Sequence, residues 1–444
     1  MTNFSEDALN VKTRKEERWI INKNQLNEFI IKIKEFADKK EELNTHNQTL
    51  YFNNQEHEAP FDVSLKARRY SSEPINGILD LNESWIFEIK EEHTSDNIRF
   101  RKKQREELTV REILEKLTKQ DIVEKYHLSL PLTVFVADSY KREQYKVKDS
   151  NGFRITIDTD PQYFFFEEGL TPIKIGEEDC VKIEIKIPLE ELKSDKIQKI
   201  NDILNELNAE PSISKKDTIY NMLRDYLNKK YNHRVPKSDT EIEAKLILNK
   251  EDQYLFHQIK KDFKQGEIKG FQILEDFPYT LENGTLHQYL VNTNQDHNVA
   301  RVSIKGDKKV FTVKGKGEII QDQFNLNCII KRQEKKYTID EVKNIISSEL
   351  LHRKRKYFIV KNILSKETYC ILIDRCTDEE NELYQMEIEG LLISSENKEQ
   401  ELNIINDISN IVNHIVKKYP QLQPSTLTKQ EWLWGLKDKS TNQN

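Results

Sequence analysis

Hydrophobic and polar residues alternate along much of the chain with the period of two that is typical of β-strands. In the segments RITID (154–158) and VKIEIKIP (181–188), apolar residues fill every second position and most of the intervening positions are charged. Because side chains i and i+2 of a strand point to the same side of a sheet, each segment presents one apolar and one charged face. The pattern predicts a protein that consists largely of amphipathic strands.

The charged faces recur in both halves of the chain. A single charged pair at period two is most simply the solvated outer face of an antiparallel sheet. Many such groups, each with apolar residues opposite, instead favour closed barrels with a polar interior and helices outside. A barrel of about eight strands has room for side chains or a small ligand. The groups are Lys66-x-Arg68-x-Tyr70, Glu88-x-Lys90, Arg99-x-Arg101, Arg154-x-Thr156-x-Asp158, Glu184-x-Lys186, Glu241-x-Glu243-x-Lys245, Arg301-x-Ser303-x-Lys305, Lys314-x-Lys316, Arg332-x-Glu334-x-Lys336, Lys354-x-Lys356 and Glu387-x-Glu389.

Helical periodicity is confined to a few segments. Apolar residues at helical spacing predict a helix within 22–36, and Thr109 begins another with a capping box. A third helical region covers 190–232 and is interrupted near Pro211. In the tail, Trp432 is expected to dock a C-terminal helix onto the protein.

A linker is predicted where the helical pattern stops, at HRVPKSDT (233–240), because Pro, Ser and Asp punctuate it. A chain of 444 residues is long enough for two domains, each with a core of its own. We therefore predict an α+β protein of two tandem antiparallel β-barrel tunnels with flanking helices. The domains are expected at residues 1–236 and 237–444.

Composition narrows the class of protein. With 70 Lys and Arg against 76 Asp and Glu, the net charge of −6 argues against a generic nucleic-acid binder, so no nucleic-acid partner is expected. No stretch approaches the ~18 apolar residues of a membrane span, and the N-terminus lacks the apolar run of a signal peptide, so a cytoplasmic protein without a membrane segment is expected. The four cysteines have no CxxC spacing and suggest neither a disulfide framework nor a zinc site.

The charges that face the predicted lumens indicate the ligand. Buried charges without partners cost several kcal/mol each, so a strongly cationic lumen implies a polyanion. The first half offers ten cations against four acids, which suits a long polyanion; the second offers eight against six, which suits a short substrate that arrives with metal ions. The acids in this count are Glu16, Glu88, Asp158 and Glu184, and then Glu241, Glu243, Glu334, Asp374, Glu387 and Glu389.

The second half contains further motifs in a recognisable order. Glu241-Ile242-Glu243-Ala244-Lys245 is followed by RVSIK, TVKGKG, KRQEK, RKRKY, CILID and QMEIE. In this order the segments resemble the CYTH family of the triphosphate tunnel metalloenzyme superfamily, which includes class IV adenylate cyclases and thiamine triphosphatases. Its ExExK motif matches 241–245. Ser303 departs from the pattern, because many members carry a second arginine there, and this concerns substrate identity rather than the fold.

The first half carries its own series of strand motifs over residues 16–216. They are Glu16-x-Arg18-Trp19, Tyr51-Phe52-Asn53, Lys66-Ala67-Arg68-Arg69-Tyr70, Glu88-Ile89-Lys90, Arg142, Arg154, Glu184-Ile185-Lys186 and Ser214-Lys215. In this order they resemble the VTC branch of the superfamily, which polymerises inorganic polyphosphate from ATP. Arg18 replaces the lysine of that branch, and the membrane segments and phosphate-sensing domains of some relatives are not found in this sequence.

The two resemblances imply a metal-dependent phosphoryl-transfer enzyme with Mg²⁺ or Mn²⁺ as cofactor and ATP, another triphosphate or polyphosphate as partner. Arg and Lys suit phosphate oxygens, and carboxylates suit the metal. The implied catalytic residues are Lys66, Arg68, Lys90, Arg142, Arg154, Lys186, Lys245, Arg301, Lys314 and Arg332. The implied substrate-binding residues are Arg18, Arg99, Arg101, Ser214, Lys215, Lys305, Lys316, Lys354 and Lys356. The implied metal ligands are Glu16, Glu88, Glu184, Glu241, Glu243, Asp374, Glu387 and Glu389.

Several activities fit these residues. We expect the first tunnel to polymerise polyphosphate from ATP and the second to hydrolyse a short triphosphate. Nucleotide cyclisation in the second tunnel is an alternative that the same fold hosts. A non-catalytic sensor of polyphosphate or nucleotide is another, to which the departures at Ser303 and Arg18 give weight. The inward carboxylates argue for catalysis, because pure polyanion binding gains nothing from them.

Overall fold

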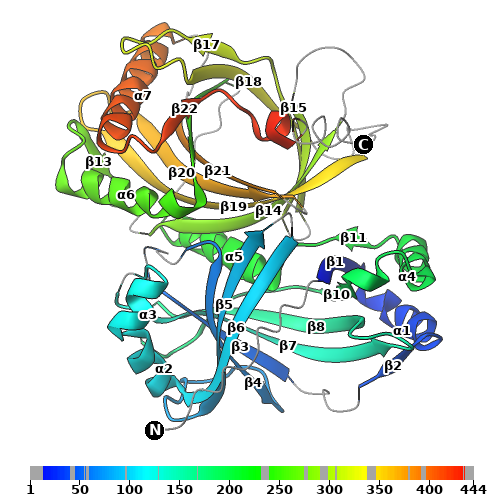
Figure 1. The fold of residues 1–444 in the computed structure, drawn as a ribbon. Coiled ribbons are helices and arrows are strands. Elements are labelled where there is room, and N and C mark those ends of the chain that lie inside the picture. The colour runs from blue at the N-terminus through cyan, green and yellow to red at the C-terminus, as the bar shows by residue number, and fades with distance from the viewer. Residues whose placement is uncertain are drawn as a thin grey trace. The chain divides into compact units, whose positions relative to one another are not determined.

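Two compact units make up the protein (Figure 1). The computed structural model describes residues 14–40, 46–54, 56, 60–95, 98–128, 130–167, 169–231, 240–274, 279–290, 299–305, 308–337, 347–378, 381–391, 397–433 and 435. The first unit comprises Met1–Asn54 and Ala59–Leu223, and the second comprises Gln55–Glu58 and Arg224–Asn444. The domain boundary that the sequence predicts near residue 236 lies outside the described residues.

The first unit is built on one antiparallel sheet with the strand order β11-β1-β10-β8-β7-β3-β4-β5-β6, to which β2 adds beside β7 and β9 beside β8. The strands are β1 (Arg14–Asn22), β2 (Ala37–Lys39), β3 (His46–Asn53), β4 (Val63–Ser71), β5 (Ser84–Ser95), β6 (Ile98–Thr109), β7 (Thr133–Val147), β8 (Arg154–Phe165), β9 (Ile173–Glu177), β10 (Cys180–Pro188) and β11 (Glu210–Pro211). The helices are α1 (Leu26–Lys34), α2 (Val110–Leu117), α3 (Gln120–Lys125) and α4 (Asp195–Glu206), and α5 (Lys215–Lys230) begins in this unit and continues past Leu223 into the second.

Helices cover the apolar faces of this sheet, as the strand pattern requires. In α1, Phe29 and Ile33 are fully buried in a cluster that includes Ile183 of β10, and α2 packs onto Trp85 of β5 in a second cluster. The predicted capping box is confirmed: the Thr109 amide donates to Glu112 Oε2 at 2.8 Å, and Thr109 Oγ1 accepts from the Glu112 amide at 3.2 Å. The predicted helical region 190–232 forms α4 and α5, separated by β11.

The second unit repeats this plan with the strand order β17-β18-β16-β15-β14-β19-β20-β21-β12-β22, and β13 pairs with β19. Its strands are β12 (Thr240–Leu248), β13 (Phe271–Ile273), β14 (Leu281–Leu290), β15 (Val299–Lys305), β16 (Lys308–Lys314), β17 (Glu318–Ile320), β18 (Ile329–Tyr337), β19 (Ser347–Asn362), β20 (Thr368–Thr377), β21 (Glu382–Leu391) and β22 (Gln423–Ser425). Its helices are α6 (Leu255–Gln265) and α7 (Lys398–Lys418). None of the described helices is long and apolar enough to cross a membrane.

In the second unit the strand pairings close into a ring. The strand β12 is hydrogen-bonded to β21 on one side and to β18 on the other, so that β12, β18, β16, β15, β14, β19, β20 and β21 form a continuous circuit. In the first unit the pairings between described residues form an open path that ends at β6 and β11. The sequence predicts two closed tunnels, and the pairings show closure for the second.

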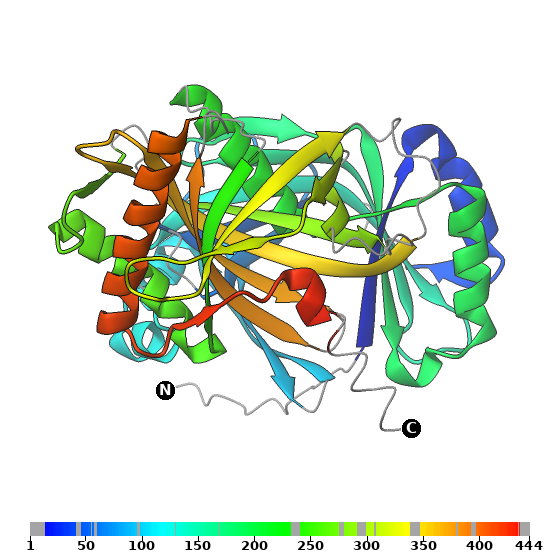
Figure 2. The same ribbon diagram turned by 90° about the horizontal axis from the view of Figure 1, so that it is seen from above.

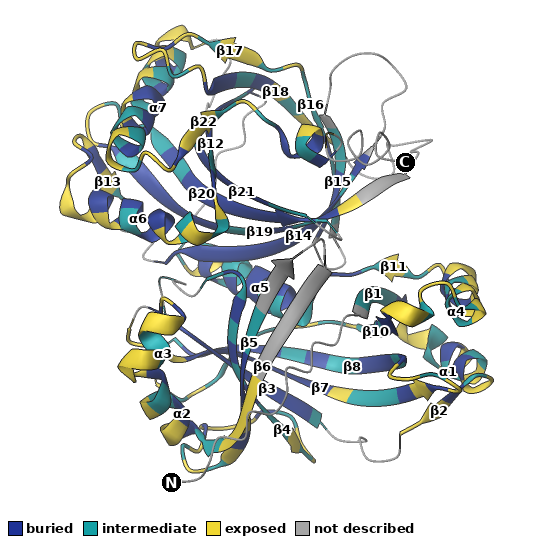
Figure 3. Ribbon diagram, viewed as in Figure 1, coloured by how far each residue is buried: buried dark blue, intermediate teal, exposed yellow. Residues whose placement is uncertain are grey.

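The outer face of the ring is apolar and carries α6 and α7. The helix α7 packs against β12, β18 and β21 (Figure 2), and most of β20 and β21 is buried (Figure 3). Close approach of α7 requires Gly390 on β21, because a Cβ atom there would lie 2.3 Å from Ile404 Cγ2. With apolar residues turned outward beneath the helices, the charged residues of these strands are left to face the interior.

Candidate functional site

A cavity of about 350 Å³ lies in the second unit, within the ring of strands. This volume falls in the usual range of ~300–1,000 Å³ for small-ligand sites. Seven of the eight ring strands and the C-terminal segment supply its wall. The lining residues are Glu241, Glu243, Lys245, His287, Tyr289, Arg301, Ser303, Val310, Thr312, Lys314, Arg332, Glu334, Lys336, Arg353, Arg355, Glu387, Glu389, Thr428, Lys429 and Gln430.

Three carboxylates of the wall form a group with the geometry of a metal site. Glu241 and Glu243 share one face of β12, and Glu243 pairs in register with Glu389 of β21. One carboxylate oxygen from each of the three residues lies within 4.8 Å of the others. Hard oxygen donors in this number suit Mg²⁺ or Mn²⁺.

Electrostatics also favour a cation at this group. Burial and the neighbouring carboxylates of Glu241 and Glu387 raise the pKa of Glu389 to about 8, in spite of Arg355. Burial and Glu243 likewise raise the pKa of Glu241, although Lys314 opposes them. Like charges held close in a poorly solvated site resist ionisation, and a divalent cation relieves that repulsion. The donor set therefore fits Mg²⁺ or Mn²⁺.

Lysines and one arginine balance the carboxylates. Lys245 Nζ lies 2.5 Å from Glu243 Oε1, and Lys314 pairs with Glu241 and, at 3.2 Å, with Glu334. The pairing with Lys245 and Lys314 outweighs burial and lowers the pKa of Glu243. Arg355 contacts three acids: it binds Asp374 through two hydrogen bonds of 2.8 Å, Glu387 at 2.9 Å and Glu389 at 3.4 Å.

Three further arginines present donors to the cavity. Arg301, Arg332 and Arg353 all line it, and among the described residues their buried Nε atoms have no hydrogen-bond partner. Burial and the nearby Arg355 lower the pKa of Arg353 to about 10. Arg332 Nε also lies 3.7 Å from Glu243 Oε1, which is too far for a hydrogen bond. Buried guanidinium donors without a hydrogen-bond acceptor are costly, so this arrangement favours an anionic ligand with several oxygens.

The structure brings together most residues that the sequence singles out in the second half. Those lining the cavity are Glu241, Glu243, Lys245, Arg301, Lys314, Arg332, Glu387 and Glu389. Asp374 is fully buried between Arg355 and Lys429 and is not among the lining residues. Lys316 is exposed and follows the end of β16, and the side chain of Lys305 lies outside the described residues.

One strand shows the opposite face to that predicted. On β19 the cavity is lined by Arg353 and Arg355, and Lys354 and Lys356 are not among its lining residues. The prediction of Lys354 and Lys356 at the lumen is therefore wrong. All four residues of the run RKRK are cationic, so composition could not choose between the two faces. Register decides: Arg355 pairs with Asp374 of β20.

Lys429 is a charged residue of the cavity that the sequence pattern did not reveal. Thr428 caps the helical turn 429–433: its amide donates to Glu431 Oε2 at 2.8 Å, and its Oγ1 accepts from the Glu431 amide at 3.1 Å. Lys429 lies at the start of this turn. Its Nζ lies 2.5 Å from Glu387 and 2.9 Å from Asp374. A capping box at Thr428 and Glu431 was the available signal.

The same triad of side chains occurs in the first unit. Arg142 binds Asp158 through two hydrogen bonds of 2.6 and 2.7 Å, and Lys215 pairs with the same carboxylate. Ser214 caps this lysine's helix, because its Oγ accepts from the Asp217 amide at 3.1 Å. The arrangement of Arg142, Asp158 and Lys215 parallels that of Arg355, Asp374 and Lys429, and in both units Arg and Asp are cross-strand partners.

The carboxylate group of the second unit, in contrast, has a different counterpart in the first. In the first unit Trp19 of β1 pairs with Pro211 of β11, and in the second unit Leu246 of β12 pairs with Pro424 of β22. If these two pairings are superimposed, Glu16 of β1 corresponds to Glu243 of β12. Glu243 faces Glu389, whereas Glu16 faces Lys186. Among the described residues, no group of three ligands suited to a metal occurs in the first unit.

The predicted metal ligands of the first unit are held by cations. Glu16 accepts from Arg18 at 3.1 Å, and Glu88 lies 3.0 Å from Lys66. Glu184 accepts from Lys186 at 2.5 Å, and, against the effect of burial, Lys186 and Arg18 hold the pKa of Glu184 well below its usual range.

The cationic residues of the first unit share the faces that bear these acids. Burial and the neighbouring Arg68 lower the pKa of Lys66 to about 7, and burial lowers that of Lys186 to about 8 despite Glu184. Arg154 pairs with Lys186 across β8 and β10, and Lys90 follows Glu88 by two residues on β5. The side chains of Arg99 and Arg101 lie outside the described residues.

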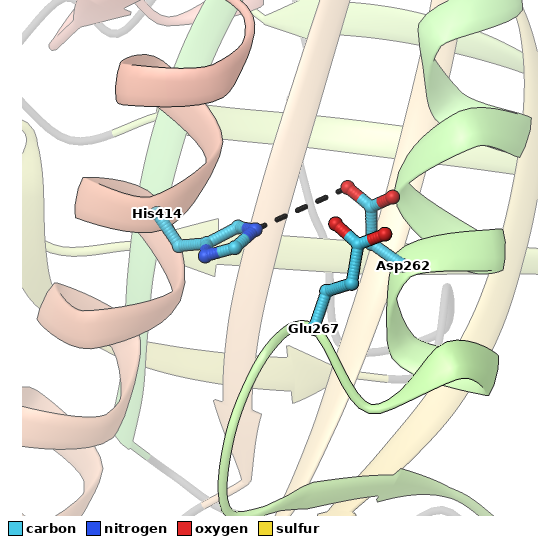
Figure 4. A group of neighbouring side chains, drawn as sticks. All are labelled: Asp262, Glu267 and His414. Carbon is cyan, nitrogen blue, oxygen red and sulfur yellow. Dashed lines mark ion pairs between the residues drawn. The ribbon is translucent and has the colours of Figure 1, made fainter.

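A second group of potential ligands lies between α6 and α7, outside the cavity (Figure 4). It consists of Asp262, Glu267 and His414, whose Nε2 lies 4.0 Å from Asp262 Oδ2. Lys418 donates to Asp262 at 2.7 Å and also pairs with Glu267, and the Tyr419 hydroxyl donates to Asp262 at 2.8 Å. The Lys418 ammonium group pairs with both acids, and these contacts join the two helices.

Several solved structures are similar to about half of this chain. A putative adenylyl cyclase from Hippeastrum, described as having a dominant triphosphatase activity, is 14% identical with a TM-score of 0.29 over 47% of this chain and 95% of its own. A putative adenylate cyclase from Bacillus halodurans is 12% identical with a TM-score of 0.29 over 46% of this chain and 94% of its own. The Mimivirus capping enzyme triphosphatase is 17% identical with a TM-score of 0.26 over 44% and 99%. No protein-family model and no curated protein matches the chain.

Proposed function

We propose that the second unit is a triphosphate tunnel of the CYTH type that hydrolyses a short triphosphate with Mg²⁺ or Mn²⁺. The observation that supports this most is the combination, within one ring of strands, of a carboxylate group and buried arginine Nε donors that have no hydrogen-bond partner among the described residues. Carboxylates alone would bind a cation, and arginines alone would bind an anion. Both together suit a polyanion that arrives with a metal.

Each set of residues has a distinct part in this reaction. Glu241, Glu243 and Glu389 would hold the metal, which supplies charge neutralisation at the phosphate oxygens. Arg301 and Arg353, with the other cations of the wall, would bind the phosphate oxygens and orient the chain. Hydrolysis joins a water oxygen to the terminal phosphorus and breaks its bond to the bridging oxygen, and it needs positioning and charge neutralisation more than covalent help.

Product analysis of the full chain tests this proposal. Incubation with inorganic triphosphate or ATP and Mg²⁺ or Mn²⁺ should release orthophosphate. Release of pyrophosphate with a cyclic nucleotide would indicate a cyclase instead, and tight binding in calorimetry without turnover would indicate a sensor. Glu241→Gln and Glu243→Gln should lower turnover about a hundredfold or more. Glu399→Gln, at an exposed residue of α7 that does not line the cavity, is the matched control, and unchanged turnover in both glutamate variants would contradict the metal assignment.

For the first unit we infer a polyphosphate-handling function, with chain extension from the γ-phosphate of ATP as the expected activity. Glu16 faces Lys186, whereas the corresponding residue of the second unit, Glu243, faces an acid, Glu389. Burial also lowers the pKa of Lys66 and of Lys186. A site that gains cations in place of acids suits a ligand with more negative charge.

Gel electrophoresis of the products tests the polymerase. The full chain carrying Glu243→Gln, which should prevent hydrolysis in the second unit, should still make a ladder of phosphate chains from ATP and Mn²⁺. Glu184→Gln or Arg68→Ala should abolish the ladder, while Glu399→Gln should preserve it. Orthophosphate without a ladder would reduce this unit to a triphosphatase.

A further inference from the structure

One side of the cavity wall carries five uncharged or weakly basic residues. They are His287 of β14, Ser303 of β15 and Val310 of β16, which are neighbours in register, and Tyr289 and Thr312, which flank Arg301 at the next level. We call these five residues the neutral wall. The rest of the lining is dominated by Arg, Lys and Glu. The cavity therefore has two chemically different sides.

The neutral wall lies across the ring from the carboxylate group. In the circuit β12-β18-β16-β15-β14-β19-β20-β21, β14 is the fourth strand from β12 in either direction, and β15 is likewise opposite β21. Glu241 and Glu243 come from β12 and Glu389 from β21. A ligand that spans the cavity from the metal group therefore reaches His287 and Ser303.

The contacts within the neutral wall are those of a hydrogen-bonding surface. Ser303 Oγ lies 2.9 Å from His287 Nδ1, and the His287 and Tyr289 rings lie 6.2 Å apart. His287 and Ser303 are 1% and 7% exposed, so a group that contacts them leaves water. The serine is also short, so it leaves space that a longer side chain would fill.

We propose that the neutral wall binds the organic end of the substrate, so that the second unit takes a nucleoside triphosphate in preference to inorganic triphosphate. This inference rests on the proposed hydrolysis. Inorganic triphosphate is charged at both ends, and across the ring from the metal group its far phosphate would meet only Arg301 and Lys314 as cations among the lining residues of β14, β15 and β16. A sugar hydroxyl or base instead finds hydrogen-bonding partners at Ser303 and His287 and a ring at Tyr289.

Paired kinetics on the full chain test the preference. The wild type should have a kcat/KM for ATP about tenfold or more above that for inorganic triphosphate. Ser303→Arg should lower kcat/KM for ATP and raise it for inorganic triphosphate, so that the ratio falls about tenfold or more. Ser303→Ala, which keeps the space and removes the hydroxyl, should lower kcat/KM for ATP alone and serves if the arginine variant does not fold.

The outcomes separate this inference from the hydrolysis itself. A wild type that prefers inorganic triphosphate, or variants that change both substrates by the same factor, would overturn the role of the neutral wall while leaving a triphosphatase in place. Turnover of neither substrate would overturn the proposed function instead. In that case, calorimetry with a non-hydrolysable ATP analogue still decides: Ser303→Arg must weaken its binding relative to inorganic triphosphate, and equal changes would refute the neutral wall.

Discussion

At the scale of single residues, the site is governed by acids and bases whose charge is costly before a ligand arrives. Glu389 is the clearest acid, because burial and neighbouring carboxylates raise its pKa to about 8. At pH 7 the metal-free protein therefore carries a proton on Glu389, and a bound cation must displace it.

Metal binding should accordingly strengthen as the pH rises. Because Glu389 holds its proton below its pKa of about 8 and metal binding must displace it, Mn²⁺ affinity is expected to increase from pH 6 to pH 8 and then to level off. Calorimetric titration in buffers of different ionisation enthalpy should detect release of that proton. Glu389→Gln should remove the release, and pH-independent affinity in the wild type would contradict the assignment.

The first unit should show the reverse dependence. Burial lowers the pKa of Lys66 to about 7, and a bound polyanion restores its charge, so binding takes up a proton. Polyphosphate affinity is expected to fall as the pH rises from 6 to 9. Fluorescence anisotropy with labelled polyphosphate measures it, and Lys66→Arg, which stays charged, should flatten the curve. An equally steep curve in that variant would show that Lys66 is not responsible.

At the scale of elements, the period-two pattern predicted which segments form strands but not always which face turns inward. The segments RITID and VKIEIKIP each alternate apolar and polar residues, and their apolar residues are buried beneath helices. Arg353 and Lys354 are both cationic, so the pattern could not predict which of them faces the cavity. Only the register of β19 with β20 places the arginine there. In the C-terminal tail, the pattern indicated only a helix docked by a tryptophan. It could not indicate a role for Lys429, because its partner Asp374 is 55 residues away in sequence (429 − 374).

Packing of α7 onto β21 should depend on Gly390. A Cβ atom there would lie 2.3 Å from Ile404 Cγ2, so Gly390→Ala must displace the helix and is expected to lower the free energy of unfolding by about 1–3 kcal/mol. Urea denaturation measures this. Gly315→Ala is the matched control, because its nearest neighbour outside the adjacent residues would be 3.7 Å away. Equal stabilities for the two variants would mean that α7 is not held as closely as described.

At the scale of the whole molecule, the two units share one strand order. The strands correspond one to one along the two paths: β1 to β12, β10 to β21, β8 to β20, β7 to β19, β3 to β14, β4 to β15, β5 to β16 and β6 to β18. The sequence indicated this repetition through recurring charged strands. It could not indicate closure, because the contact of β12 with β18 joins segments about 90 residues apart that no local pattern links.

The division into two domains has a direct test. Limited proteolysis is expected to cut first within 233–240, where Pro, Ser and Asp interrupt the helical pattern, and to leave two folded halves. Mass spectrometry of the fragments locates the cut, and circular dichroism shows whether each half keeps its strands. A protein that resists cleavage there and is degraded as one core would contradict independent domains.

The place of Lys429 in the cavity has a consequence for synthesis of the protein. The lining residues run in sequence from Glu241 to Gln430, and Lys429 is the last charged one among them. A ribosome must therefore have made almost the whole unit before the acids Glu387 and Asp374 meet their lysine. Chains that stop short would keep two buried acids with a cation missing, a fault that lowers stability and exposes incomplete copies to proteases.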